Sequence, residues 1–174
     1  MPQERTGAYK MRDNPLTLLG PEMKVGAKAP DFSVVGNDMK PITLDSSKGK
    51  ARIIATVQSL DTGVCDQESK KWNELASQLP NVEILVVSKD LPFAQRRWCN
   101  SSGVQNIKTG SAYRDDSKFG EEYGVLVKET RFLARAVFVV DANGVVRHVQ
   151  QVPDLLELPD FDAAAAAAKK ASGR

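Results

Sequence analysis

Three stretches of the chain are apolar at nearly every position, a pattern typical of strands that are covered on both faces of a sheet. They are residues 52–57, 82–88 and 135–141. Between the first two, apolar side chains recur at helical spacing over residues 64–79. A strand, a helix and a second strand in this order predict a βαβ unit, in which the strands are parallel and the crossover is right-handed.

The remaining segments extend this pattern. Residues 31–36 alternate and then break, as in an edge strand. Asn143-Gly144 is a strong turn signal and predicts an antiparallel hairpin between residues 137–140 and 145–149. A short strand is predicted at residues 42–44, and helices at residues 94–100, 117–124 and 160–170. The fold class that follows is α/β, with a mixed central sheet flanked by helices.

Length indicates one domain. The chain has 174 residues and a mass of 19.0 kDa, which suits a single domain over residues 1–174. Residues 1–20 are rich in glycine, proline and charge around one short apolar stretch, so we predict an N-terminal arm or hairpin there. Residues 171–174 are expected to form a loose tail after the alanine-rich last helix.

The composition excludes several classes of protein. Hydrophobic residues make up 41% and charged residues 26% of the chain, a normal mixture for a soluble globular protein. A formal charge of +2 is too small to argue for a nucleic-acid or membrane surface. The sequence has no run of about 18 apolar residues for a transmembrane helix, and its start lacks the apolar segment of a secretory signal. We therefore predict a cytoplasmic protein without nucleic-acid or membrane partners.

Candidate chemistry is limited by one histidine and two cysteines. These residues cannot make a zinc finger or a two-histidine metal motif, so neither a metal nor another cofactor is expected. A Ser-His-Asp site would have to use His148, which has no nucleophile signature nearby. In the cytoplasm a permanent structural disulfide is not expected. Cys65 and Cys99 are therefore either inert or catalytic.

Cys65 stands where a strand gives way to a helix, in the segment Ser59-Leu60-Asp61-Thr62-Gly63-Val64-Cys65. Thr62 is a candidate N-cap, which would place Cys65 at the third helical position. Backbone N–H groups are unpaired there and the helix dipole favours an anion. Because the thiolate is the reactive form and helix N-termini favour it, Cys65 is a candidate nucleophile. The alternative is a small buried hydrophobic residue beside an ordinary cap.

Cys99 and Arg135 each have two interpretations. Cys99 forms no Cys-x-x-Cys motif with Cys65, and each cysteine is predicted on its own helix. A disulfide needs Cα atoms within about 7 Å, so joining the two would require local unfolding. The alternative is a packed core thiol beside Trp98. Arg135, flanked by a β-branched run, must be paired or functional because a lone buried charge is expensive, and a salt bridge to a nearby acid is the alternative.

Several segments, in order and with matching spacing, resemble the bacterial thiol peroxidase branch of the peroxiredoxins. They are Ser59 to Cys65 as quoted, Asp90-Leu91-Pro92-Phe93-Ala94-Gln95 followed by Cys99, Ala134-Arg135-Ala136-Val137, and the further stretches 25–32 and 123–125. The resemblance runs from about residue 14 to the C-terminal helix. It implies a thioredoxin-like fold and a thiol-specific peroxidase that reduces hydrogen peroxide and organic hydroperoxides.

The resemblance also implies roles for individual residues. Cys65 matches the peroxidatic cysteine and Cys99 the resolving cysteine, with an intramolecular Cys65–Cys99 disulfide formed in the cycle. Thr62 matches the threonine that hydrogen-bonds the thiolate and peroxide, and Arg135 the arginine that holds them electrostatically. The family is reduced by thioredoxin and tends to form homodimers. Gln58 is a departure, because the family has at this position a proline that shields the cysteine from water.

Two other functions compete with the peroxidase. One is a general thiol-disulfide oxidoreductase on the same fold, against which the absence of Cys-x-x-Cys argues. The other is a redox-responsive binding protein, whose Cys65–Cys99 bridge would remodel a surface. Glu68, three residues after Cys65, also fits the family, and it is alternatively a first-turn acid that favours the helix dipole.

Overall fold

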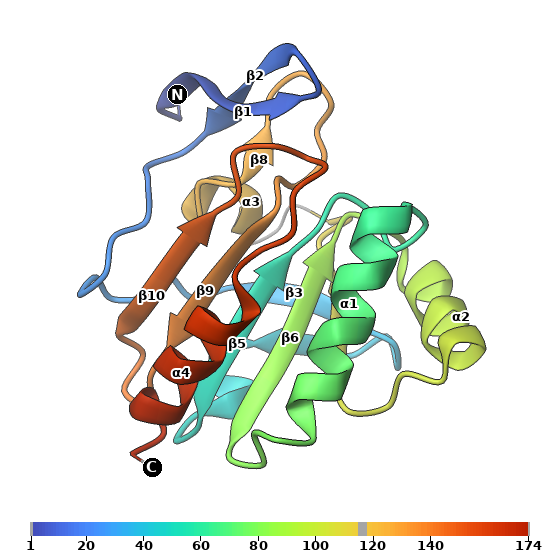
Figure 1. The fold of residues 1–174 in the computed structure, drawn as a ribbon, viewed down its shortest axis with the longest axis vertical. Coiled ribbons are helices and arrows are strands. Elements are labelled where there is room, and N and C mark those ends of the chain that lie inside the picture. Colours follow the sequence, from blue (N-terminus) through green and yellow to red (C-terminus); the bar gives the residue numbers. More distant parts are fainter. Residues whose placement is uncertain (1, 115–117, 174) are drawn as a thin grey trace.

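Strands and helices alternate through the middle of the chain, whereas its first four elements are all strands (Figure 1). The computed structural model describes residues 2–114 and 118–173. Its strands are β1 (Glu4–Met11), β2 (Asn14–Leu19), β3 (Ser33–Gly36), β4 (Pro41–Thr43), β5 (Ala51–Thr56), β6 (Val82–Ser88), β7 (Lys108–Ser111), β8 (Leu126–Val127), β9 (Ala136–Val140) and β10 (Val146–Gln151). Its helices are a 3-10 turn (Leu44–Ser47), α1 (Gly63–Ala76), α2 (Pro92–Ser102), α3 (Phe119–Glu122) and α4 (Phe161–Ala171).

The main sheet has the strand order β10-β9-β5-β6-β7-β3-β4. Its centre is parallel, because β5 pairs with β6 and β6 with β7 in that sense. The outer pairs are antiparallel. The predicted βαβ unit is therefore present, with α1 as the crossover, and the predicted mixed sheet flanked by helices is confirmed.

Two hydrophobic cores lie on opposite faces of this sheet. Neighbouring side chains of a strand alternate between them, since a strand has a period of two residues. In β9, Val137 and Val139 join the core under α1 and α4, while Phe138 and Val140 join the core that contains α3. In Figure 1, α1 and α4 lie side by side across one face of the sheet and α2 lies beside α1. Because both faces are covered, β5, β6 and β9 are apolar at most of their positions.

The predicted N-terminal hairpin is formed by β1 and β2, which pair antiparallel. β2 also pairs with β8, so that the hairpin belongs to a separate three-stranded sheet. Figure 1 shows it across the upper end of the molecule, the end at which β5 and β6 finish and α1 begins. The hairpin thus covers the end of the sheet where Cys65 lies.

The structure corrects some details of the sequence prediction. β3 is not an edge strand, because β4 folds back on it and takes the outermost position. β7 was not predicted, since its sequence Lys-Thr-Gly-Ser has no strand-like apolar pattern. The helix predicted at 117–124 shortens to α3, and residue 117 lies outside the described residues. The tail predicted at 171–174 is described only as far as residue 173, and α4 includes its first residue.

Candidate active site

Cys65 occupies the first turn of α1, as the sequence predicted. Thr62 is the N-cap residue, with an extended backbone, and the helix begins at the next residue, Gly63. Cys65 is fully buried. The Thr62 hydroxyl, however, does not cap the helix; it donates to the carbonyl oxygen of Ser59 at 2.8 Å. The first turn is therefore left without a capping side chain, and its N–H groups and dipole favour negative charge at this position.

The loop before α1 is held by one carboxylate. Asp90 follows β6 and accepts a hydrogen bond from the Ser59 hydroxyl at 2.6 Å and from the Leu60 N–H at 2.8 Å. It also accepts from the Ser88 hydroxyl at 2.7 Å. β5 and β6 are parallel neighbours, so the loops after them meet at the same edge of the sheet. Asp90 belongs to one of the motifs of the predicted family, but no local sequence pattern indicates this positioning role.

Arg135 is brought to Cys65 from the other side of β5. It precedes β9, the antiparallel neighbour of β5. Its Nη2 donates to the Cys65 Sγ at 3.5 Å and to the Leu155 carbonyl oxygen at 2.7 Å, while Nη1 forms a buried ion pair with Glu68. The sequence left two interpretations of Arg135 open, a contact with the cysteine and a salt bridge to an acid. One guanidinium makes both.

Of the two interpretations of Glu68, the first-turn acid is wrong, because α1 begins at Gly63 and its first-turn acid is Asp66. Glu68 is fully buried, and it accepts from the Trp72 indole N–H at 3.1 Å as well as from Arg135. Burial raises the pKa of Glu68, against the opposing effects of Arg135 and Trp72. Burial alone would lower the pKa of Arg135, but Cys65 and Glu68 raise it. Since arginine is not deprotonated in proteins, the Arg135 guanidinium is a permanent cation beside Cys65.

The N-terminal hairpin braces this arrangement through the backbone. The Lys10 N–H donates to the Pro153 carbonyl at 2.9 Å, and the Leu155 N–H donates to the Lys10 carbonyl at 3.0 Å. The carbonyl of Leu155 is the one that accepts from Arg135. Tyr9, also on β1, is buried, and its hydroxyl has no hydrogen-bond partner among the described residues. The first strand therefore reaches the site in two ways that no local sequence pattern indicates.

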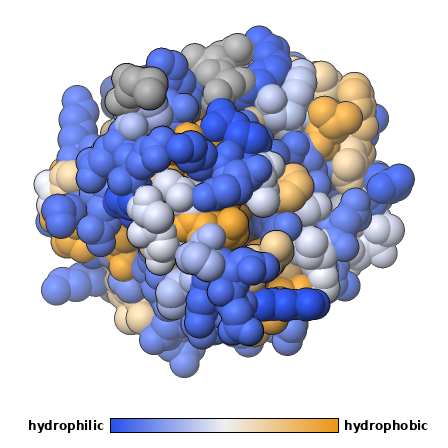
Figure 2. Space-filling model, turned by 90° about the horizontal axis from the view of Figure 1, so that it is seen from above, coloured by the Kyte–Doolittle hydropathy of each residue, from blue (hydrophilic) through white to orange (hydrophobic). Residues whose placement is uncertain are grey.

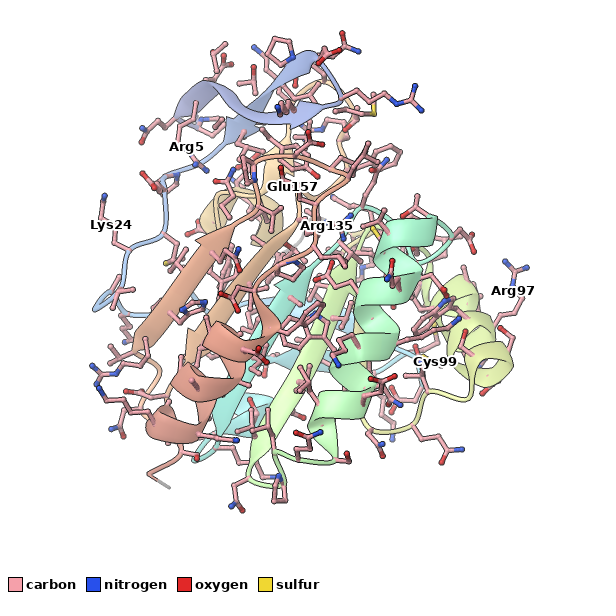
Figure 3. All side chains as sticks on the ribbon, in the orientation of Figure 1. Arg5, Lys24, Arg97, Cys99, Arg135 and Glu157 are labelled. Carbon is pink, nitrogen blue, oxygen red and sulfur yellow. The ribbon has the colours of Figure 1, made fainter. Side chains whose placement is uncertain are left out.

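Cys99 lies apart from this centre. It is on α2, nearly fully buried, and its Sγ lies 3.6 Å from Asn37 Nδ2 and 3.7 Å from Thr109 Oγ1. Both cysteines are free thiols. Figure 3 shows Arg135 near the start of α1 and Cys99 at the flank of the molecule formed by α2. The structure thus brings Arg135, but not Cys99, to Cys65.

Gln58 is half-buried in the loop between β5 and α1, and its Oε1 has no hydrogen-bond partner within the described residues. Cys65 nevertheless has no exposed surface. The glutamine at this position therefore does not open the cysteine to solvent.

The surface around this end of the molecule is mixed. Figure 2 views the molecule from above and shows a mostly hydrophilic surface with separate hydrophobic areas. The large apolar side chains that stay exposed include Leu91, Phe93, Phe132 and Leu156. Within residues 2–114 and 118–173, no group of three or more His, Cys, Asp or Glu side chains could hold a metal ion. None of the helices in those ranges is long and apolar enough to cross a membrane.

Comparison with known proteins identifies the class. A family model described as Redoxin matches residues 24–166, and the chain therefore belongs to the redoxin family. The thiol peroxidase of Halalkalibacterium halodurans is 54% identical over 92% of this chain and 96% of its own length. That of Listeria innocua is 50% identical over the same shares. The crystal structure of a peroxiredoxin-like protein from Aquifex aeolicus superposes with a TM-score of 0.89 at 42% identity, covering 96% of this chain and 97% of that one.

These similarities confirm the predicted family and the predicted thioredoxin-like fold of the peroxiredoxins. The structural likeness covers 96% of the chain. The Redoxin match over residues 24–166 contains Cys65, Cys99 and Arg135.

Proposed function

We propose that this chain reduces hydroperoxides with Cys65 as the attacking thiolate and Arg135 as the cation that holds it. The prediction of a thiol-dependent peroxidase, an oxidoreductase, is confirmed by the family and by relatives named thiol peroxidase. The observation that carries the residue roles is the 3.5 Å contact between Arg135 Nη2 and Cys65 Sγ at a helix N-terminus. Cation and dipole both stabilise a thiolate at this position.

The first step transfers one oxygen atom. The thiolate of Cys65 attacks the terminal oxygen of the hydroperoxide, an S–O bond forms and the O–O bond breaks. The departing oxygen takes the hydroperoxide proton and leaves as alcohol or water, and the sulfenate that remains is protonated to a sulfenic acid. The Thr62 hydroxyl already donates to Ser59, so its oxygen is available to accept the O–H of the incoming hydroperoxide.

Thiolate population alone cannot provide the rate. A cysteine of ordinary pKa is a few per cent thiolate at neutral pH, so complete ionisation gains roughly thirtyfold, or about 2 kcal/mol. Enzymes commonly accelerate a reaction more than a millionfold, which corresponds to lowering the activation free energy by more than about 8 kcal/mol. Alignment of the peroxide and stabilisation of charge on the departing oxygen must supply the remainder. Arg135 has the charge and the position for both.

The second and third steps form a disulfide and then regenerate the thiols of Cys65 and Cys99. The Cys99 sulfur attacks the sulfenic sulfur, so that an S–S bond forms, the S–O bond breaks and water leaves with the thiol proton. An external dithiol of the thioredoxin type then supplies two electrons and two protons by exchange, and both cysteines become thiols again. A thioredoxin-type reductant and a hydroperoxide substrate are the partners that such a cycle requires.

Two further proposals concern the oligomeric state and the cellular location of the protein. We propose a homodimer formed near the active site, because the exposed apolar side chain of Leu156 is next to Leu155, which holds Arg135, and because Leu91 and Phe93 are exposed at the start of α2. We also propose a cytoplasmic location, because a cycle that starts from two free thiols needs a reducing compartment.

The test is stopped-flow tryptophan fluorescence of the reduced protein mixed with hydrogen peroxide or cumene hydroperoxide, followed by mass spectrometry. Trp98 is next to Cys99 and reports the rearrangement of α2. We expect fast oxidation to an intramolecular Cys65–Cys99 disulfide with both peroxides. Oxidation no faster than that of a free thiol would instead favour a redox-responsive binding protein. Reduction of insulin disulfides without peroxide would favour a general oxidoreductase.

A further inference from the structure

One hydrogen bond joins the immediate neighbours of the two cysteines. The indole N–H of Trp98 donates to Asp66 Oδ1 at 2.7 Å. Asp66 follows Cys65 on α1, and Trp98 precedes Cys99 on α2. The bond is charge-assisted and short, and the indole is nearly fully buried, whereas the Asp66 carboxylate is one-third exposed and also pairs with Lys70. We call this Trp98–Asp66 bond the interhelix tie.

The Cys99 sulfur has contacts of its own, separate from the interhelix tie. Its contacts are with Asn37, in the turn after β3, and with Thr109 on β7. These two are bonded to each other, because the Thr109 hydroxyl donates to Asn37 Oδ1 at 2.8 Å. The contacts to sulfur are long and made by neutral groups, so each is weak. The interhelix tie is therefore the strongest single polar restraint described on this part of α2.

Disulfide formation cannot leave this arrangement intact. The two sulfurs must come within about 2 Å of each other, whereas Cys65 contacts Arg135 and Cys99 contacts Asn37 and Thr109. The last turn of α2 must open for Cys99 to move. Trp98 is bonded to Cys99 through the backbone, so its indole is pulled away from Asp66 as that turn opens.

Resting on the proposed function, we infer that the interhelix tie sets the rate at which Cys99 resolves the Cys65 sulfenic acid, with Asp66 and Trp98 as positioning residues for that step. The tie stabilises the closed form of α2 and is lost in the open form. It therefore slows resolution and lengthens the life of the sulfenic acid. During that time a second hydroperoxide can oxidise the sulfenic acid to sulfinic acid, with release of alcohol or water.

The test separates the two phases of oxidation in the full-length reduced protein. Chemical quenching and mass spectrometry follow sulfenic acid and disulfide at several hydrogen peroxide concentrations. The first phase depends on peroxide concentration, and the second is unimolecular. For Trp98→Phe and Asp66→Ala, we expect the rate of disulfide formation, relative to the rate of oxidation by peroxide, to rise about tenfold. This is the factor expected from the loss of one hydrogen bond to a charged group. The sulfinic fraction at high peroxide should fall accordingly.

Three controls distinguish the tie from general loosening of α2. Lys70→Gln breaks the 2.9 Å salt bridge of Asp66 to Lys70 but leaves the tie, so both phases should keep the parental rates. Asp66→Asn retains an acceptor oxygen without the charge, so its ratio should lie between those of the parent and Asp66→Ala. The double variant Trp98→Phe with Asp66→Ala should behave like either single variant, because both remove the same bond.

The outcomes are distinguishable from those of the proposed function. If the parent forms no Cys65–Cys99 disulfide, the proposed function and the inference both fail. If the parent forms it but Trp98→Phe and Asp66→Ala change the ratio by less than twofold, the inference alone is wrong. Additive effects in the double variant would likewise overturn it, since they would show two independent contributions to stability rather than one bond.

Discussion

The two cysteines lie in contrasting surroundings. Cys65 is at the N-terminal turn of α1, has no exposed surface, and its sulfur contacts a charged guanidinium that is itself buried and paired. Cys99 is near the C-terminal end of α2, and its sulfur has two longer contacts with neutral side chains. The dipole of a helix favours an anion at its start and disfavours one at its end.

This difference shows how one fold gives two thiols different tasks. The surroundings of Cys65 stabilise a thiolate and hold it rigidly, because Arg135 is fixed by Glu68 and by the Leu155 carbonyl. The surroundings of Cys99 stabilise a neutral thiol with contacts that break easily. A resolving thiol has to travel, so weak neutral contacts suit it better than an ion pair.

The largest effect is expected from exchanging each sulfur for oxygen. Cys65→Ser should abolish fast reaction with hydroperoxides, because the sulfur of the remaining thiol, Cys99, contacts the neutral side chains of Asn37 and Thr109 rather than a guanidinium. Cys99→Ser should consume a single equivalent and then stall when thioredoxin and its reductase are supplied. Peroxide consumption coupled to NADPH oxidation measures both. Sustained turnover of Cys99→Ser would remove the assignment of Cys99 as the resolving residue.

Removing Arg135, the cation that contacts Cys65, should have the next largest effect on peroxide reduction. Arg135→Ala is expected to slow peroxide reduction at least about a hundredfold, more than the roughly thirtyfold that thiolate population can explain. Rates measured across pH by stopped flow separate the two contributions. Equal pH-corrected rates for variant and parent would contradict the prediction.

Arg52 offers a matched control for that variant. It is also buried, and it donates to Ser47, to the Asp141 carbonyl and to the Leu44 carbonyl near the start of β5, the end of that strand remote from Cys65. Arg52→Ala should lower the melting temperature while the folded protein reacts with peroxide at the parental rate.

Substituting Glu68 tests how much the ion pair with Arg135 contributes to the stability of the folded protein. Glu68→Ala should lower the free energy of unfolding by about 3–5 kcal/mol, because a buried charge loses its partner. Glu68→Gln keeps an oxygen for Trp72 and Arg135 and should lose less. Urea denaturation measures both values. A loss below about 1 kcal/mol in Glu68→Ala would mean that Leu155 and Cys65 are sufficient partners for the guanidinium.

The smallest effect concerns Tyr9, on the wall of the Cys65 site. Burial raises the pKa of Tyr9 to about 12, from an ordinary value of 10.0. Between these two pH values the unfolded chain releases this proton and the folded chain keeps it. Stability should therefore fall as pH rises from about 10 to 12, by about 2 kcal/mol for this one group. In Tyr9→Phe, urea denaturation across this range should show a shallower decline.

Tyr123 is the comparison for this experiment. Burial raises its pKa as well, but its hydroxyl donates to the Pro30 carbonyl at 2.7 Å, whereas the Tyr9 hydroxyl has no partner among the described residues. At neutral pH, Tyr123→Phe should lose about 1 kcal/mol and Tyr9→Phe almost nothing. Equal losses at neutral pH would show that the Tyr9 hydroxyl is hydrogen-bonded in the folded protein, with the Arg135 backbone as the candidate partner.

Several elements that depend on short-range periodicity could be predicted from the sequence. The βαβ unit, the Asn143-Gly144 hairpin and the position of Cys65 in the first turn of α1 follow from spacing and turn chemistry. β7 could not be predicted in this way, because it is four residues long and contains glycine. Contacts between distant residues were missed too. The local sequence does not show that Glu68 is buried, and only the folded chain places Arg135 beside it.

The bracing of Arg135 by the first strand has a practical consequence for handling the protein. Lys10 holds Pro153 and Leu155 by two backbone bonds, and Leu155 holds the guanidinium, so the beginning of the chain is mechanically part of the active site. A purification tag or a shortened start that displaced β1 would loosen the arginine from more than a hundred residues away in sequence. Fusions to this protein belong at its C-terminal end, where α4 finishes at the opposite end of the molecule (Figure 1).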